Sequence, residues 1–242
     1  MMFELEHHRH ILRILNALDA TFFHRIQAYF GGGTLLALLH GEYRWSKDID
    51  FICPVGEGYR LLRSEIAEHG YNALFTDATT LTLPRAFKAD QYGVRFAVQI
   101  EDTLIKFEII AEGRIKLDAP VHYDWCNVPC LSFADSCTEK LLSNADRWPD
   151  ASVKSRDLLD LAMLRLQANL PLPAIDKAEI AYPVITPLRK AIDHFQCNPQ
   201  YRQACFSALQ VKNSSMLLDG IDLLAADQGL PPTVRTVLET LG

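Results

Sequence analysis

The sequence lacks the features of membrane, secreted and disulfide-bonded proteins. No apolar run approaches the roughly 18 to 20 residues that cross a bilayer, and the opening MMFELEHHRH does not have the basic and then apolar layout of a secretory signal. Its six cysteines are scattered through 242 residues, and Cys126 and Cys130, half of a possible metal site, have no second pair at ligand spacing. We therefore expect a cytoplasmic protein with ordinary reduced thiols and no membrane partner.

Positive charge is scarce as well, with 24 Lys and Arg residues against 30 Asp and Glu residues and a formal net charge of -6. Broad binding to nucleic acid depends on basic side chains that neutralise phosphates, so the composition disfavours it and leaves a local basic groove as an alternative. A nucleoside triphosphate held by metal ions and a few donors is compatible with an acidic chain. The apolar fraction of 49% is that of a globular protein, and the chain has neither an internal repeat nor a low-complexity tract.

An amphipathic helix is expected over residues 4–20, where leucine and isoleucine recur at spacings near three and four. Its polar half contains His7, His8 and His10. We assign these histidines no carboxylate or cysteine partner at metal-ligand spacing. We therefore interpret them as a solvated helix start rather than as a metal site.

The rest of the first half alternates strands and helices. The patterns predict strands at 28–30 and 48–54, helices at 34–41 and 57–70, and strands at 93–100 and 103–110. The last two strands are joined by Glu101 and Asp102 and form an expected antiparallel hairpin. This half therefore reads as an α/β domain, with bounds at residues 1–128.

The second half has helical periodicity throughout. Helices are predicted at 132–148, 152–167, 185–196, 199–210 and 231–242, and residues 169–176 read as a proline-marked connector. We therefore expect an all-α domain over residues 129–242.

Asp48 and Asp50 are separated by one residue in the expected strand 48–54, and the two-residue period of a strand directs both carboxylates to one face. Two like charges so close repel each other. Divalent cations shared between them relieve the repulsion, and carboxylate oxygens are ligands that Mg²⁺ prefers. A solvated strand end is the alternative for this pair by itself.

A glycine-rich turn precedes the expected helix 34–41. Gly31, Gly32 and Gly33 let the backbone turn sharply and approach a ligand, and Thr34 is a natural N-cap. Unpaired N–H groups and the positive end of the helix dipole then favour phosphate. We place a phosphate-binding turn here, with a simple tight turn before a helix as the alternative.

Glu108 is the candidate third carboxylate of a two-metal site. Strand alternation puts it on the less apolar face of the segment 103–110 together with Lys106. A charge among apolar neighbours pairs with Lys106 or another basic group, or binds metal. Glu101 and Asp102 are weaker candidates because they lie at the expected turn.

The run GGGTLLALLHGEYRWSKDIDF resembles the first motif of the nucleotidyltransferase superfamily, Gly-Gly-Ser/Thr followed by Asp-x-Asp. In particular it is similar to the AbiEii-type nucleotidyltransferases of bacterial abortive-infection and toxin-antitoxin systems. The resemblance implies a DNA polymerase beta-like mixed α/β (α+β) sheet with flanking helices, followed by an all-α domain. It assigns nucleotide binding to Gly32, Gly33, Thr34, Arg44, Ser46 and Lys47.

Two later segments, TEKLLSNADR and KSRDLLDL, are similar to further motifs of that family. The resemblance implies that Lys140 contacts the triphosphate, that Asp157 orients this lysine or the acceptor, and that Asp160 supports it. Arg156 stands where family members carry lysine, with Lys154 two positions earlier; a permanently charged arginine binds phosphate but is a poor base. Surface salt bridging is the alternative explanation for these two helices.

The resemblance covers roughly residues 28–165 and implies a metal-dependent enzyme. Mg²⁺ or Mn²⁺ held by Asp48, Asp50 and Glu108 would serve the transfer of a nucleotide from an NTP to an acceptor hydroxyl. The implied protein is a toxin acting on a tRNA end and restrained by an antitoxin. Two alternatives stay open: a protein or small-molecule acceptor, and a catalytically silent nucleotide-binding module acting through protein contacts.

Overall fold

The computed structural model describes residues 3–78, 81–237 and 239, and the chain forms two compact units. The first unit comprises residues 1–39 and 46–132, and the second comprises residues 40–45 and 133–242. The division predicted from the sequence lies between residues 128 and 129. In the structure the two units divide at Ser132 and Phe133, and the short segment 40–45 also belongs to the second unit.

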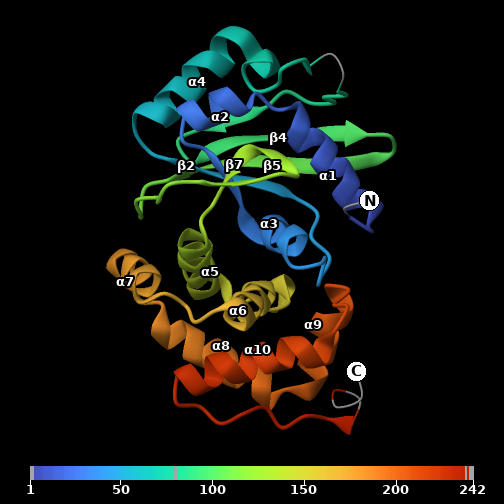
Figure 1. Ribbon diagram of the computed structural model, residues 1–242, viewed down its shortest axis with the longest axis vertical. Helices are drawn as coiled ribbons and strands as arrows, with labels where there is room; N and C mark the ends of the chain where they lie inside the picture. The colour runs from blue at the N-terminus through green and yellow to red at the C-terminus, as the bar shows by residue number, and fades with distance from the viewer. Residues whose placement is uncertain (1–2, 79–80, 238, 240–242) are drawn as a thin grey trace. The chain divides into compact units, whose positions relative to one another are not determined.

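The first unit is built on a seven-stranded mixed sheet with the order β3-β4-β5-β2-β1-β7-β6 (Figure 1). β2 pairs in parallel with β5 and β1 with β7, whereas the other neighbours are antiparallel. The strands are β1 (Tyr29–Gly31), β2 (Ile49–Pro54), β3 (Lys88–Asp90), β4 (Gly93–Ile100), β5 (Thr103–Glu112), β6 (Val121–Tyr123) and β7 (Cys126–Cys130).

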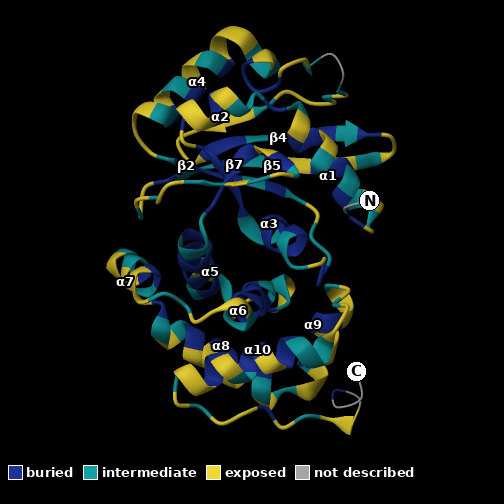
Figure 2. Ribbon diagram, viewed as in Figure 1, coloured by how far each residue is buried: buried dark blue, intermediate teal, exposed yellow. Residues whose placement is uncertain are grey.

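Helices cover both faces of this sheet. α2 (Ala20–Arg25) and α4 (Glu57–His69) lie on one side and α3 (Gly32–Leu39) on the other, while α1 (Glu6–Ala17) packs against β7 (Figure 1). A short 3-10 turn, η1 (Gly70–Ala73), follows α4. Figure 2 shows the strands between these helices as largely buried.

Aromatic side chains fill the core of the sheet. The rings of Phe51 and Phe107 stack with centroids 5.4 Å apart, and Phe96 stacks on Phe107 at 4.5 Å. The predicted hairpin is confirmed, because Ile100 faces Thr103 in the antiparallel register. The predicted alternation along β5 is confirmed as well, with apolar side chains buried on one face.

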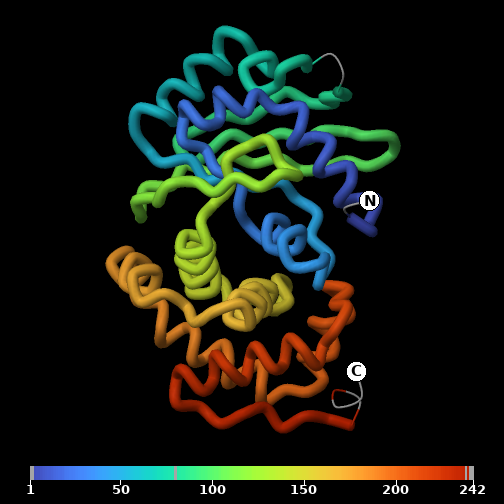
Figure 3. Tube along the Cα trace, in the orientation of Figure 1, coloured from blue at the N-terminus to red at the C-terminus, as the bar shows by residue number. Residues whose placement is uncertain are grey.

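The second unit is helical. Its elements are α5 (Phe133–Arg147), η3 (Ala151–Val153), α6 (Arg156–Gln167), α7 (Leu172–Ala181), α8 (Ile185–Cys197), α9 (Pro199–Ala208) and α10 (Ser214–Asp227). α6 and α10, far apart in the sequence, pack side by side (Figure 3). Among the described residues no helix is long and apolar enough to cross a membrane.

Several sequence expectations need correction. The predicted connector at 169–176 contains the start of α7, because Pro173 stands in the first helical turn, where its missing N–H costs nothing. Residues 231–236 of the predicted final helix are not helical, and 238 and 240–242 lie outside the described residues. The elements α2, β3 and β6 were not predicted, since six residues or fewer are too few for a clear period. The five-residue inner strand β7 and the 14-residue helix α10 were not predicted either.

Candidate active site

Two of the predicted metal-binding carboxylates are neighbours across adjacent strands. Asp50 on β2 lies opposite Glu108 on β5 in the parallel register and opposite Gly31 on β1 in the antiparallel register. Residues paired in register project to the same face of a sheet. Asp50 and Glu108, 58 positions apart in numbering but one strand apart in space, are therefore brought to one face of the sheet.

The glycine turn lies directly against Asp50. Gly32 has a φ of +70°, and a Cβ atom at this position would stand 2.8 Å from Asp50 Oδ2. Only glycine tolerates both the left-handed backbone and this close approach. The turn therefore needs Gly32 for two independent reasons, whereas the binding of phosphate at this turn stays a prediction.

Asp48 adjoins the same turn through its backbone. Thr34 Oγ1 donates to the Asp48 carbonyl at 2.6 Å and lies 2.8 Å from Ser46 Oγ. Two expectations were wrong here. Asp48 precedes β2 rather than lying in it, and Thr34 is not an N-cap, because α3 already begins at Gly32. Thr34 is buried and holds the segment before β2 in place.

Glu108 makes ion pairs with two cations. Arg95 Nε lies 3.1 Å from Glu108 Oε1, and Lys106 Nζ contacts Oε2. The alternative of pairing with Lys106 is therefore observed, and Arg95 on the neighbouring strand β4 is an additional partner, while metal binding by Glu108 stays a prediction. Arg95 also pairs with Asp90 at 3.2 Å. These cations offset the charge that Glu108 and Asp50 would otherwise concentrate on one face.

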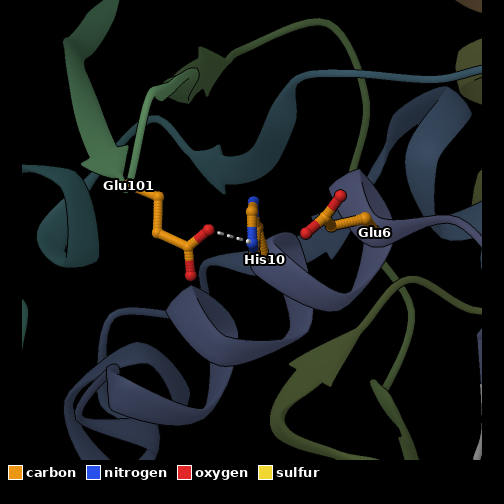
Figure 4. A group of neighbouring side chains, drawn as sticks. All are labelled: Glu6, His10 and Glu101. Atoms are coloured by element: carbon orange, nitrogen blue, oxygen red, sulfur yellow. Dashed lines mark ion pairs between the residues drawn. The ribbon is translucent and has the colours of Figure 1, made fainter.

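A different group brings metal-ligand atoms close together. Within residues 3–78, 81–237 and 239, the one such group is Glu6, His10 and Glu101, whose ligand atoms lie within 4.8 Å of one another. Asp48, Asp50 and Glu108 do not meet that criterion. Figure 4 shows Glu6 and His10 on α1 and Glu101 reaching toward the His10 ring, where Nε2 and Glu101 Oε2 are 3.9 Å apart.

This group has a simpler explanation than a metal site. Both carboxylates are exposed, and the His10–Glu101 pair joins α1 to the β4–β5 turn. Glu6 precedes His10 by one helical turn, a spacing that the sequence analysis overlooked. We interpret the group as surface ion pairing.

Lys140 and Asp157 meet inside the second unit. Lys140 Nζ on α5 lies 3.0 Å from Asp157 Oδ1 on α6, and Arg147 pairs with the same carboxylate through Nε at 2.6 Å and Nη2 at 2.8 Å. Asp157 and Lys140 are buried. The alternative of surface salt bridging is therefore wrong for this pair, because the contact lies in the interior of the helical unit.

Asp160 also binds side chains of the segment 40–45. Arg44 donates to its two oxygens from Nε at 2.6 Å and from Nη2 at 2.8 Å, Tyr43 donates its hydroxyl at 2.5 Å, and Lys140 Nζ lies 2.6 Å away. Asp160 is fully buried. This six-residue excursion between α3 and β2 is thus fastened to α6 by a bidentate, charge-assisted contact.

The two aspartates stay ionised although they are buried. Burial alone would raise the pKa of Asp157, but the charge of Lys140 and the hydrogen bonds from Arg147 outweigh it and lower this pKa below its usual range. Burial opposes the ionisation of Asp160 in the same way, and the charges of Arg44 and Lys140 lower its pKa. Three cations therefore face two carboxylates, which leaves the cluster with one excess positive charge.

The remaining predicted residues have plain positions. Arg156 is the first residue of α6 and is half-buried, Lys47 is exposed, and Gly33 follows Gly32 in the first turn of α3. The nucleotide-binding roles assigned to these residues, to Arg44 and to the Lys140 cluster stay predictions.

Two histidines on α1 have roles that the sequence did not predict. His8 is fully buried, so the expected solvated helix start is wrong for this residue and for the buried His10. His8 Nε2 donates to the Ser46 carbonyl at 2.9 Å, and His7 Nε2 donates to the Lys47 carbonyl at 2.9 Å. The adjacent histidines were the available signal, but their acceptors lie about forty residues away and follow no sequence period.

Comparisons with known proteins agree with this architecture. Residues 13–183 match the family described as "Nucleotidyl transferase AbiEii toxin, Type IV TA system". A crystal structure from H. pylori, provisionally assigned as a nucleotidyltransferase, aligns with a TM-score of 0.51 and 16% identity over 92% of this chain and 93% of that chain. JHP933 from Helicobacter pylori aligns with a TM-score of 0.52 and 14% identity over 94% of each chain.

The two structures share the fold of this chain, and no curated protein matches it. The family match confirms the resemblance carried by the glycine turn and the Asp-x-Asp segment, and with it the enzyme class. The mixed sheet with flanking helices and the helices that follow it confirm the expected fold class. The chain therefore belongs to the AbiEii family of nucleotidyltransferase toxins of type IV toxin-antitoxin systems.

Proposed function

We propose that this protein uses Mg²⁺ or Mn²⁺ to transfer a nucleotide from an NTP to an acceptor hydroxyl, and a tRNA end is the first acceptor to test. The observation that carries the metal proposal is the register pairing of Asp50 with Glu108 beside the Gly32 turn. The family description supplies the reaction class and the toxin role.

The residues present fit a hard divalent cation. Asp48, Asp50 and Glu108 offer oxygen ligands alone, the donor set that Mg²⁺ prefers. The Asp50 carboxylate lies directly against the start of α3, where a Cβ atom on Gly32 would stand 2.8 Å from Oδ2. When bound, the metal would neutralise phosphate charge and activate the attacking oxygen.

The chain's own groups would position the nucleotide. Backbone N–H groups of Gly32, Gly33 and Thr34 at the start of α3 are suited to phosphate oxygens, since the first N–H groups of a helix have no intrahelical partner. Lys140 and Arg156 are proposed as further phosphate ligands. Contact with Asp157 would orient the Lys140 side chain, and Asp160 and Arg44 would support that arrangement.

The partner implied by this family is an antitoxin. A type IV toxin-antitoxin assignment predicts that the activity is restrained in the cell by a second gene product. We propose this restraint for the present chain. Expression of the chain alone should slow bacterial growth, and the Asp48→Asn variant should not.

The proposal is tested with the purified chain, Mg²⁺, each radiolabelled NTP in turn, and total tRNA. We expect pyrophosphate release and labelled tRNA from the wild type, loss of at least 100-fold for Asp48→Asn and Asp50→Asn as expected for the loss of an essential group, and loss of activity with EDTA. Asp102→Asn is the matched control, because this aspartate is exposed in the β4–β5 turn. Wild-type rates in Asp48→Asn would refute the assignment.

A second set of reactions tests the identity of the acceptor independently of the reaction class. Total protein and a panel of small hydroxyl compounds replace tRNA under the same conditions. Label on protein or on a small molecule would keep the enzyme and move the acceptor, whereas pyrophosphate release with none of the three acceptors would contradict transfer altogether.

A further inference from the structure

Three consecutive backbone carbonyls directly before β2 are held by side chains from other parts of the first unit. Hydrogen bonds from side chains to three successive carbonyls are unusual for a loop, whose backbone is ordinarily exposed and mobile. The three contacts, donor first, are His8 Nε2 to Ser46 O at 2.9 Å, His7 Nε2 to Lys47 O at 2.9 Å and Thr34 Oγ1 to Asp48 O at 2.6 Å.

The histidine contacts have defined chemistry. A carbonyl oxygen only accepts, so Nε2 of each ring carries the proton that it donates. His8 is fully buried on α1, whose other buried side chains are His10 and the apolar residues Ile11, Ile14 and Leu15. A buried imidazole needs such a partner, and the Ser46 carbonyl supplies it.

The position of Asp48 depends on this segment. An aspartate carboxylate is only one methylene removed from its Cα atom, so a shift of the backbone moves the carboxylate by a similar amount. A catalytic or metal-binding group has to stay within about 0.5 Å of its productive position. Asp48 precedes β2 and so lacks the sheet pairing that fixes Asp50.

We propose that His8, assisted by His7, is a positioning residue that fixes the Ser46–Asp48 backbone and thereby sets the direction of the Asp48 carboxylate for a divalent cation. This inference rests on the proposed function, because it presumes that Asp48 binds metal. His8 itself touches neither metal nor substrate. In this proposal it acts through its hydrogen bond to the Ser46 carbonyl.

The competing explanation is that His8 only fastens α1 to the rest of the unit. His10 provides the matched control. It lies on the same helix and is likewise buried, and its ion-pair partner is Glu101 rather than the segment before β2. A structural role would make His8→Leu and His10→Leu equivalent, whereas a positioning role would not.

The experiment measures Mn²⁺ binding to the full chain by electron paramagnetic resonance and counts only the binding that Asp48→Asn abolishes. Loss of an outer partner of a metal ligand typically lowers affinity roughly 10- to 100-fold. We expect that loss in His8→Leu, recovery to within about threefold in His8→Gln, whose amide can donate in place of Nε2, and no change in His10→Leu. Hydrogen exchange of residues 46–50 should rise in His8→Leu and not in His10→Leu.

The possible results distinguish the positioning role of His8 from the metal site itself. Equal Mn²⁺ affinity in His8→Leu and the wild type, or equal losses in His8→Leu and His8→Gln, would overturn the positioning role while the metal site stands. If Asp48→Asn binds Mn²⁺ as tightly as the wild type does, both the metal site and the positioning role of His8 are refuted. If His8→Leu does not fold, Mn²⁺ affinity is measured in His7→Leu and hydrogen exchange of residues 46–50 in His8→Gln. These two measurements then test the positioning role.

Discussion

Replacing Asp160 with asparagine removes the charge at the centre of the buried cluster. The carboxylate accepts from Tyr43 and Arg44 at 2.5 to 2.8 Å and contacts Lys140 at 2.6 Å, all inside the second unit. Asparagine keeps one acceptor oxygen but turns an N–H donor group toward a cation. Removing one partner of a buried ion pair costs about 3 to 5 kcal/mol, because the remaining charges stay buried without compensation.

The predicted loss is measurable by calorimetry and by urea unfolding followed by circular dichroism. At about 2 to 4 °C per kcal/mol for a chain of this size, the melting temperature of Asp160→Asn should fall by on the order of 10 °C. The unfolding midpoint in urea should fall as well, with little change in the slope.

Asp227→Asn is the matched control for this experiment. Asp227 also accepts two hydrogen bonds from one arginine, Arg165, at 2.6 and 3.1 Å, but its side chain is 37% exposed. Solvent screens such a pair, so the loss should be under about 1 kcal/mol. Similar losses in both variants, or a loss under about 1 kcal/mol for Asp160→Asn, would refute the reasoning from burial.

Two further predictions concern the glycine turn and acid stability. Gly32→Ala should lower the free energy of unfolding by about 1 kcal/mol because of its positive φ, and it should also lower the rate of nucleotide transfer. Gly41→Ala is the control, because Gly41 has the same φ of +70° but nothing within 4 Å of an added Cβ, so this variant should lose stability only. Equal transfer rates in the two variants would contradict the expected clash between the Cβ added at position 32 and Asp50. The pKa of Asp157 is lowered in the folded state, so its contribution to the free energy of unfolding is complete above the unfolded pKa of about 3.9 and is lost as the pH falls below it. The melting temperature, measured between pH 7 and pH 2, should therefore fall more steeply below pH 4 in the wild type than in Asp157→Asn. Parallel plots of melting temperature against pH for the two proteins would count against the buried ion pair.

The local pattern of the sequence determines much of this protein's structure. The alternation of apolar residues predicted the β4–β5 hairpin and placed Glu108 on the same face as Lys106, because a strand repeats every two residues regardless of its neighbours. The glycine turn and the Asp-x-Asp segment carried the family assignment for the same reason, since their chemistry lies within a short stretch of chain.

Contacts between distant segments were decided by the tertiary structure alone. The register that sets Asp50 beside Glu108 depends on β2 and β5 lying next to each other, with a parallel connection that no local period encodes. The hydrogen bond from His8 to Ser46 and the ion pair between Arg44 and Asp160 join residues 38 and 116 positions apart. Each requires two backbones to meet in space, and such a meeting is fixed by the packing of the whole core rather than by the residues that take part in it.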